Sequence, residues 1–368
     1  MGNYIKLNTT VQEDKALSIT KNYFGTLPDG TDVDSFTLIN SKNMSVDIIN
    51  FGGIVVSICV PDKNGNIADV ALGYAQLDKY IDNDAYIGAL VGRHANRIED
   101  ARFELNGKVY ELLKNDGENH LHGGGIGLHN VVWKAEVSEQ NGKEKLVLTH
   151  TSPDGEENYP GKLDVTVEYS LSEENELIID YTAISDKDTV VNLTNHAYFN
   201  LAGHNSGDAT QHQLFINADY FTPVNDECIP IGVITSVKGT VMDFTEMKCI
   251  ADDINSTDEQ IVYGIGYDHN WVLNTKGDIN ELAAELYDPK SGRAMEVYTT
   301  KPGVQFYSGN HLSEKYIGKD DIVYNARTGL CLETQYFPNA MKHKNFPSPI
   351  LRAGEKYHHI TIYKFTNK

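Results

Sequence analysis

The stretch GKLDVTVEYSLSEENELIIDYTAIS, residues 161–185, decides the fold class of this chain because apolar and polar residues alternate along it. The alternation stops at SEEN, residues 172–175, a sequence typical of a turn, and then resumes. A period of two places one face of a strand on a core and the other toward water or a second layer. We therefore predict two antiparallel strands here. The residues expected on the core face are Leu163, Val165, Val167, Tyr169 and Leu171 before the turn and Leu177, Ile179, Tyr181 and Ala183 after it.

The same period of two recurs in residues 31–40 (TDVDSFTLIN), 144–150 (EKLVLTH) and 294–300 (AMEVYTT). Helical patterns are short and few, and only residues 75–84 and 246–255 could each form two or three turns. Sheets of this extent must pack against another layer to bury their apolar faces. We expect an all-β fold, a large antiparallel β-sandwich with a few short helices.

The length of the chain leaves the number of domains open. On average 368 residues would suggest about two domains, but all-β folds often form one larger unit. No low-complexity linker and no repeat of constant period divides the sequence. We therefore expect a single β-sandwich domain over residues 1–368.

The composition is strongly acidic, with a formal net charge of −21 at pH 7 and only six arginines. A nucleic-acid-binding protein needs a basic surface, and such an excess of acid also disfavours anionic partners. No apolar run reaches the length of a signal peptide or a membrane span. The four widely separated cysteines, Cys59, Cys228, Cys249 and Cys331, suit free thiols in a reducing compartment. We expect a cytoplasmic monomer or homodimer without nucleic-acid or membrane partners.

Half of the arginines fall in one short segment, VGRHANRIEDAR, residues 91–102. Arg102 suits an exposed ion pair with one of the many acidic residues of the chain. Arg97 lies between Asn96 and Ile98, which suggests partial burial. A buried guanidinium needs a defined partner, and an oxygen of a ligand is one candidate.

Two histidines, His120 and His122, lie in NHLHGGGIGLHNVVW, residues 119–133, and would share a face if this segment is a strand. They could bind a metal, donate hydrogen bonds to a ligand, or be satisfied by the backbone beside a turn. A metal site would require further ligands at short spacing, and the chain contains no H-E-x-x-H sequence. We therefore predict no metal site here.

A third histidine, His196, lies in NLTNHAYFNLAG, residues 192–203. A single histidine is more often a satisfied core residue than a functional one. Here, however, Asn195, Tyr198 and Asn200 surround it with amide groups and aromatic rings. Amides and rings together are what the hydroxyl groups and the apolar faces of a sugar require, so this segment is a candidate wall of a sugar pocket.

Three further segments place a polar side chain among apolar or aromatic ones. They are GIGYDHNWVL with Asp268, TTKPGVQFYSGN with Gln305, and GLCLETQYFPN with Glu333. Asp268 could be a turn residue, or it could hold a sugar together with the indole of Trp271. Glu333 ends an apolar run, where burial of a carboxylate is costly without a partner. Burial would raise its pKa toward the range of a general base, so Glu333 is the strongest single candidate.

Taken in order, these segments resemble the signatures of the aldose 1-epimerase (galactose mutarotase) family. The likeness runs from residue 92 to residue 340, and the flanking strands extend it over nearly the whole chain. One departure is GLHN, residues 127–130, where the family more often carries an aromatic and an acidic residue after the glycine. The matching segments are GRHANRI, NHLHGG with GLHNVVW, TNHAYFNLAG, YDHNW, TKPGVQFYSGN and ETQYFPNA.

The resemblance implies a large antiparallel β-sandwich and an isomerase that acts on a monosaccharide without a cofactor. It implies that His196 is the general acid, that Glu333 is the general base and that His122 is a second active-site histidine. It gives no catalytic role to Arg93 or His120. The residues that it associates with the substrate are Arg97, Asp268 and Gln305, with Asn96 and Tyr198 in neighbouring positions of the same motifs.

Two other functions stay open on the sequence alone. A glycoside hydrolase could use Asp268 and Glu333 as its two carboxylates. A sugar-binding protein without turnover could keep the same pocket, although binding alone needs no matched acid and base. An epimerase acting on phosphorylated sugars would require a basic cluster for the phosphate, and none is obvious in a chain with so few arginines.

Overall fold

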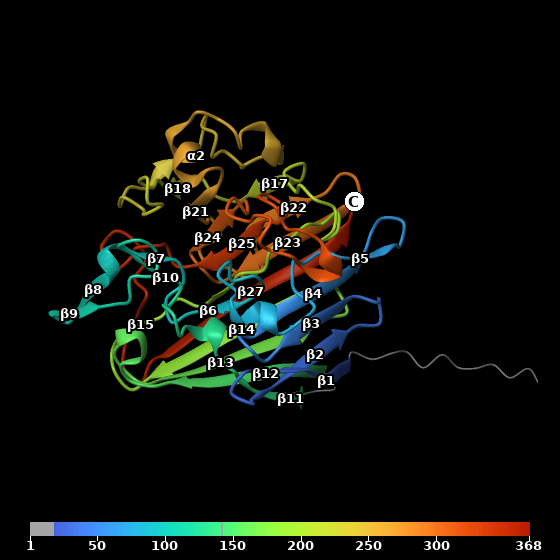
Figure 1. Ribbon diagram of the computed structural model, residues 1–368. Coiled ribbons are helices and arrows are strands. Elements are labelled where there is room, and N and C mark those ends of the chain that lie inside the picture. The colour runs from blue at the N-terminus through green and yellow to red at the C-terminus, as the bar shows by residue number, and fades with distance from the viewer. Residues whose placement is uncertain (1–17, 141–142) are drawn as a thin grey trace, which may run out of the picture.

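The structure is a computed structural model that describes residues 18–140 and 143–368. The stretch on which the expected absence of a signal peptide depends lies mostly outside these residues. Strands dominate, and every pairing between named strands is antiparallel, so the predicted all-β fold is confirmed (Figure 1). Three large sheets contain most of the described strands.

The largest sheet has nine strands and includes the alternating segment of residues 161–185. Strands β13 and β14 form the predicted hairpin, closing at the pair Leu171 and Leu177. Their predicted inward residues are all buried. In sheet order the strands are β11 (Lys134–Gln140), β12 (Lys143–Ser152), β13 (Leu163–Leu171), β14 (Glu176–Ser185), β27 (Lys356–Asn367), β23 (Arg293–Thr299), β22 (Ala284–Tyr287), β17 (Gln213–Ile216) and β20 (Lys248–Cys249).

A second sheet of five strands comes from the N-terminal part of the chain and lies beside β11–β14 in Figure 1, where it is blue. Its residues Phe36 and Val46 belong to the same hydrophobic cluster as Leu148 and Tyr169 of the nine-stranded sheet. The two sheets therefore share one core. The strands, which follow one another in chain order, are β1 (Ser18–Thr26), β2 (Asp32–Ile39), β3 (Ser45–Ile49), β4 (Ile54–Pro61) and β5 (Ile67–Asp69).

The third sheet, which we call the site sheet, has one apolar face and one polar face. Val304 and Phe306 lie in the shared core, whereas Gln305, between them on the same strand, lies on the opposite face. The apolar face packs on the nine-stranded sheet, where Tyr363 of β27 donates a hydrogen bond to the Leu332 carbonyl. In sheet order the strands are β19 (Thr235–Ser236), β18 (Tyr220–Thr222), β21 (Asp268–Val272), β24 (Gly303–Tyr307) and β25 (Cys331–Gln335).

Four two-stranded pairs complete the set of described strands. Two of them carry residues singled out in the sequence: one ends at Asn195, next to His196, and one contains Arg97. The pairs are β6 (Leu90–Val91) with β16 (Thr194–Asn195), β7 (Arg97–Ile98) with β10 (His120–Leu121), β8 (Arg102–Leu105) with β9 (Lys108–Glu111), and β15 (Thr189–Val190) with β26 (Ile350–Leu351).

Helices are short, and one of the two helical predictions is wrong. Helix α1 (Asp78–Ile81) lies within the first predicted segment, although it makes only about one turn. The second segment is an edge strand, β20, followed by a 3₁₀ turn, because the N–H groups of Ile250 and Ala251 donate to carbonyls of a neighbouring segment. Helix α2 (Glu259–Gly264) begins after it, capped by the Asp258 side chain. The 3₁₀ turns are Glu99–Ala101, Leu128–Asn130, Glu156–Asn158, Ile250–Asp252 and Lys319–Asp321.

None of these described helices has the length and apolar character needed to cross a membrane.

Candidate active site

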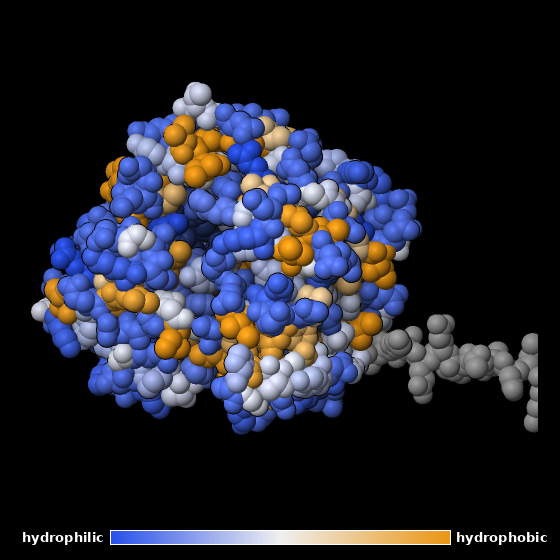
Figure 2. All heavy atoms as spheres, viewed as in Figure 1, coloured by the Kyte–Doolittle hydropathy of each residue, from blue (hydrophilic) through white to orange (hydrophobic). Residues whose placement is uncertain are grey.

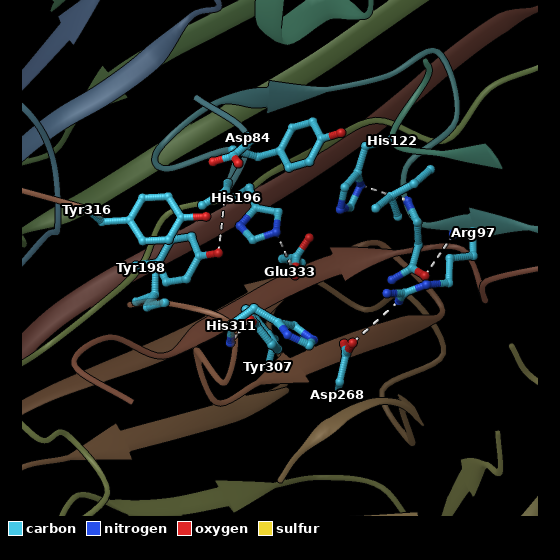
Figure 3. Close-up of a pocket in the computed structure, with 15 residues that line it drawn as sticks. Asp84, Arg97, His122, His196, Tyr198, Asp268, Tyr307, His311, Tyr316 and Glu333 are labelled. Atoms are coloured by element: carbon cyan, nitrogen blue, oxygen red, sulfur yellow. Dashed lines mark hydrogen bonds and ion pairs between the residues drawn. The ribbon is translucent and has the colours of Figure 1, made fainter. Parts of the chain in front are cut away.

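One pocket gathers nearly all the residues that the sequence singled out. It opens where the surface is hollowed near the middle of the face seen in Figure 2, and hydrophilic residues surround much of the opening. Side chains from the site sheet meet side chains from the short strand pairs there (Figure 3). The residues that line it are Asp84, Ala85, Tyr86, Asn96, Arg97, Leu121, His122, His196, Tyr198, Asp268, Tyr307, His311, Leu312, Tyr316 and Glu333.

The backbone of His196 is fixed on both sides by a neighbouring segment. Its N–H donates to the Ala89 carbonyl at 2.9 Å, and its carbonyl accepts from the Gly88 N–H at 3.0 Å. The imidazole stacks with the ring of Tyr198 on one side, at 5.0 Å between centroids, and with that of Tyr86 at 6.0 Å. Tyr198 is itself held by a hydrogen bond from its hydroxyl to the Ala85 carbonyl. The plane of the His196 ring is therefore set by packing.

Glu333 reaches the same point from the site sheet. Its Oε1 lies 3.7 Å from Nε2 of His196, and the two side chains are only 2% and 6% exposed. Its second oxygen, Oε2, is buried without a hydrogen-bond partner among the described residues. An unpartnered buried carboxylate oxygen is costly, so the hydrogen-bonding capacity of Glu333 is not met by the described protein groups alone.

Burial shifts both of these groups toward their neutral forms. It raises the pKa of Glu333 well above its usual value, and the nearby charge of Asp268 adds to this shift while Arg97 opposes it. Burial likewise lowers the pKa of His196 to about 4. Because the two groups face each other, one proton bound between them can lie on either side without changing the net charge of the pair. Such an arrangement is suited to proton transfer near neutral pH.

At the other side of the pocket, Arg97, Asp268 and Gln305 hold one another, and we call these three residues the clamp. Arg97 donates through Nη1 to Asp268 at 3.4 Å and through Nε to Asp116 at 2.7 Å. Gln305 donates to the second oxygen of Asp268 at 2.7 Å. Burial alone would lower the pKa of Arg97, but the Asp268 and Asp116 carboxylates outweigh it and raise that pKa. The clamp is a fixed array of charge and hydrogen-bonding groups.

His122 lies between these two parts of the pocket and has an unusual backbone. Its φ is 53°, and φ is 65° at Asn96 and 54° at Tyr86, so three lining residues occupy the left-handed region that non-glycine residues rarely adopt. The Asn96 N–H donates to Nδ1 of His122 at 3.1 Å, and the other ring nitrogen has no hydrogen-bond partner among the residues that the structure describes. Backbone strain of this kind clusters at functional sites, where the surrounding structure maintains it.

Three residues of the pocket could also hold a metal ion. One ligand atom from each of His122, His196 and Glu333 lies within 4.8 Å of the other two, and all three residues are buried. Two histidines and one glutamate form the protein ligand set of some catalytic zinc sites. Burial lowers the pKa of His122 well below its usual value, with the positive charges around it adding to the shift, so its imidazole is neutral at pH 7.

Seven of the eight predicted site residues line the pocket: His196, Glu333, His122, Arg97, Asn96, Asp268 and Tyr198. The eighth, Gln305, lies directly behind Asp268 and is 3% exposed. Two arginines outside the prediction lie elsewhere. Arg93 is buried and donates to the Ser152 hydroxyl and to four backbone carbonyls, and Arg102 forms an exposed ion pair with Asp100 at 3.3 Å, as expected.

Two possibilities that the sequence left open for neighbouring side chains are excluded. His120 and His122 do not share a face, because β10 ends at Leu121 and the backbone then turns at His122. The His120 ring instead bonds to the Leu113 carbonyl and to the Tyr159 hydroxyl, away from the pocket. Trp271 is not a sugar platform beside Asp268. The two residues are three apart on one strand and therefore face opposite sides, and Trp271 lies in the core.

Sequence reasoning missed most of the aromatic wall. Tyr86, Tyr307 and Tyr316 line the pocket together with His311 and Asp84. Of these, Tyr307 had a detectable signal, since it lies two residues after Gln305 on one strand and so shares its face. The others lie outside the strands of the site sheet, and no periodic pattern marks them.

Comparison with known proteins gives a consistent result for sequence and structure. The family model described as aldose 1-epimerase matches residues 34–364. The chain is 42% identical to galactose mutarotase of Rattus norvegicus over 95% of its own length and 99% of the relative's. It is 37% identical to aldose 1-epimerase of Escherichia coli strain K12, over 92% and 96%. The crystal structure of galactose 1-epimerase from Lactobacillus acidophilus NCFM aligns with a TM-score of 0.85 at 30% identity, over 96% and 99% of the two chains. This chain therefore belongs to the aldose 1-epimerase family.

Proposed function

We propose that this protein is a mutarotase that interconverts the α and β anomers of free aldohexoses such as galactose and glucose. The observation that carries the proposal is the 3.7 Å approach of Nε2 of His196 to Oε1 of Glu333 inside a buried, polar pocket. Anomer exchange needs a base at the C1 hydroxyl and an acid at the ring oxygen. Those two oxygens are bonded to the same carbon, so the base and the acid must lie close together.

The reaction requires only two proton transfers in each direction. Ionised Glu333 takes the proton of the C1 hydroxyl, the bond between C1 and the ring oxygen breaks, and protonated His196 delivers its proton to that oxygen. The open-chain aldehyde turns about the C1–C2 bond and presents its other face. Closure then returns one proton from Glu333 to O1 and one from the sugar to His196. No electrons and no net proton are exchanged.

The remaining residues hold the sugar and the charge that develops on it. His122 and Arg97 lie where they can donate hydrogen bonds to ring substituents and stabilise a developing negative charge on oxygen. Asp268, kept in place by Arg97 and Gln305, accepts hydrogen bonds from hydroxyl groups. Asn96 and Tyr198 complete the polar and aromatic walls. Holding groups on one side of the ring leave C1 free to rotate.

The alternatives are less well supported by the geometry. A glycosidase would need Asp268 as an acid or a nucleophile, yet both of its oxygens already accept hydrogen bonds from the clamp. A sugar phosphate would need free basic groups. Arg97 is the one arginine or lysine among the lining residues of the described chain, and it is paired with two carboxylates. We also propose that the chain forms a single domain and that the protein is cytoplasmic.

Polarimetry tests the proposal directly. Freshly dissolved α-galactose and α-glucose should relax to anomeric equilibrium faster with the protein than in buffer alone, and the Glu333→Gln variant should lack most of this acceleration. The same preparation should release no reducing sugar from a disaccharide. Acceleration that survives unchanged in both Glu333→Gln and His196→Asn would show that the pair is wrongly assigned.

A further inference from the structure

Strand β25 presents three side chains to the polar face of the site sheet, and each lies against a residue of the proposed site. Cys331, Glu333 and Gln335 alternate with core-facing residues and are all buried. Glu333 faces Nε2 of His196, and Gln335 donates to the Oε1 atom of Gln305 at 3.2 Å. Cys331 places its Sγ 3.6 Å from Nδ1 of His196. The imidazole of His196 thus contacts Cys331 through Nδ1 and faces Glu333, on the same strand, through Nε2.

Among the described residues, the thiol of Cys331 is the one side chain within hydrogen-bonding distance of Nδ1 of His196. The stacked rings of Tyr86 and Tyr198 fix the plane of the imidazole, but stacking alone does not decide whether Nε2 or the carbon Cε1 faces Glu333. A half-turn about the Cβ–Cγ bond would keep the plane but put Cε1 in the place of Nε2 and Cδ2 in the place of Nδ1. The contact with Cys331 favours the orientation in which Nε2 faces Glu333.

We propose that Cys331 is a positioning residue for His196: its thiol engages Nδ1 so that Nε2 is the nitrogen that exchanges a proton with the substrate. The inference depends on the proposed role of His196 as the general acid. A thiol can both donate and accept a hydrogen bond, though weakly. It can therefore accept from Nδ1–H both while the imidazole is protonated and after it has given up the proton on Nε2.

The weakness of the thiol as a partner has a consequence for the chemistry. A carboxylate or a carbonyl at this position would stabilise the charged imidazolium and make it a poorer acid. The thiol orients the ring with much less of this stabilisation. It is not a nucleophile itself, since burial, reinforced by the charge of Glu333, raises its pKa well above the usual value and keeps it protonated.

The test compares Cys331→Ser and Cys331→Ala with the matched controls Cys249→Ser and Cys249→Ala. Cys249 contacts the Thr210 carbonyl at the same distance of 3.6 Å but lies outside the pocket. Removal of a single weak hydrogen bond should lower kcat about threefold to tenfold in Cys331→Ala with little change in KM, and serine should restore it. The acidic limb of the pH–rate profile should lie at the highest pH in Cys331→Ser and at the lowest in Cys331→Ala. Both Cys249 variants should behave as wild type.

Nitrogen-15 NMR of ring-labelled histidine gives a readout that does not depend on activity. The His196 resonances, assigned by their loss in His196→Asn, should change in Cys331→Ala and stay near the wild-type positions in Cys331→Ser. Unchanged ring resonances or an unchanged kcat in Cys331→Ala would overturn the proposal, as would equal losses in the alanine and serine variants. Full activity of His196→Asn would instead refute the proposed acid, and the ring resonances would still report whether Cys331 positions the imidazole.

Discussion

The two sides of the pocket differ in how completely their polar groups are paired. On one side the clamp is nearly closed: Arg97 has two carboxylate partners, and both oxygens of Asp268 accept hydrogen bonds. On the other side His196 and Glu333 stand 3.7 Å apart, and Oε2 of Glu333 has no partner among the described residues. Both sides are buried, so burial alone does not separate them.

This difference matches the work that we propose for each side. Groups that hold a substrate gain from being fixed in advance, because little ordering remains to be done on binding. Groups that transfer protons must keep a free lone pair or a free proton directed at the reacting atom. The buried carboxylate oxygen of Glu333 that has no hydrogen-bond partner among the described residues therefore lies on the side of the pocket where chemistry rather than binding is expected.

The largest expected effect comes from removing one member of the pair. Glu333→Gln and His196→Asn should each lower kcat about 10²–10⁴-fold, because each deletes a positioned acid or base. KM should change much less. The double variant should be little worse than the more damaged single variant, since the two groups act as a unit. Polarimetry on α-galactose measures these rates.

The matched controls for these variants are Glu168→Gln and His358→Asn, which alter surface ion pairs with Lys145 and Asp180 outside the pocket. Both should retain wild-type kcat. If the losses in the double variant multiply, His196 and Glu333 act independently, and the contrast drawn between the two sides of the pocket fails.

A second, smaller effect should follow from opening the clamp. Asp268→Asn removes the charge that Arg97 and Gln305 are bonded to, and loss of hydrogen bonds to a charged group should lower kcat/KM about ten- to a hundredfold. The effect should appear mainly in KM. Asp116→Asn changes the more exposed partner of Arg97, 35% exposed against 9% for Asp268, and should cost less. A loss confined to kcat would place Asp268 with the acid and base instead.

The pH profile should be bell-shaped, falling about tenfold per pH unit beyond each limb. Below about pH 4, where burial places the pKa of His196, both groups are protonated and the base is lost. Above the raised pKa of Glu333 the last proton leaves and the acid is lost. Between the limbs the pair carries one proton, and the fraction in the reactive form is constant. The rate of the uncatalysed reaction is subtracted at each pH.

Two outcomes would be decisive for this profile. A catalysed rate that stays constant over the whole pH range, with neither an acidic nor an alkaline limb, would contradict the pairing of His196 with Glu333. In Asp268→Asn the alkaline limb should move to lower pH, since the negative charge of Asp268 adds to the effect of burial on Glu333. An unmoved limb would mean that the two sides of the pocket are electrostatically independent.

The smallest expected effect is that of a chelator. Prolonged dialysis against EDTA should leave kcat unchanged, because the proposed proton transfers need no metal. His122, His196 and Glu333 are nonetheless close enough to bind one. Loss of activity on dialysis, restored by added zinc but not by magnesium, would replace the acid–base pair by a metal site built on the same three residues.

The sheets were predictable because strand periodicity is a local property. The alternation in residues 161–185 needs only a core on one side to produce the β13–β14 hairpin, and that core exists. The segment 246–255 failed for the opposite reason. Its apolar spacing fits a helix, but the adjacent strand β17 offers backbone partners at Gln213 and Leu214, and tertiary pairing prevails over local preference.

The site was predictable by resemblance but only partly from the residues themselves. Glu333 stood out because a carboxylate after an apolar run must be buried or bound. The place of Gln305 behind Asp268 could not be seen, since it depends on the register of β21 against β24. Tyr86 and Tyr316 come from segments without a periodic pattern, and only the tertiary fold brings them to the pocket.

The proposed proton donor and the proposed proton acceptor come from different sheets: His196 follows β16, which pairs with β6, and Glu333 lies in β25. Neither hairpin nor sheet contains a working centre by itself. Catalysis should thus vanish as soon as these layers separate, while spectroscopic strand content persists, and it should return last on refolding. The rate of turnover should therefore report whether the sheets that carry His196 and Glu333 are fully packed together, more sensitively than a measure of secondary structure does.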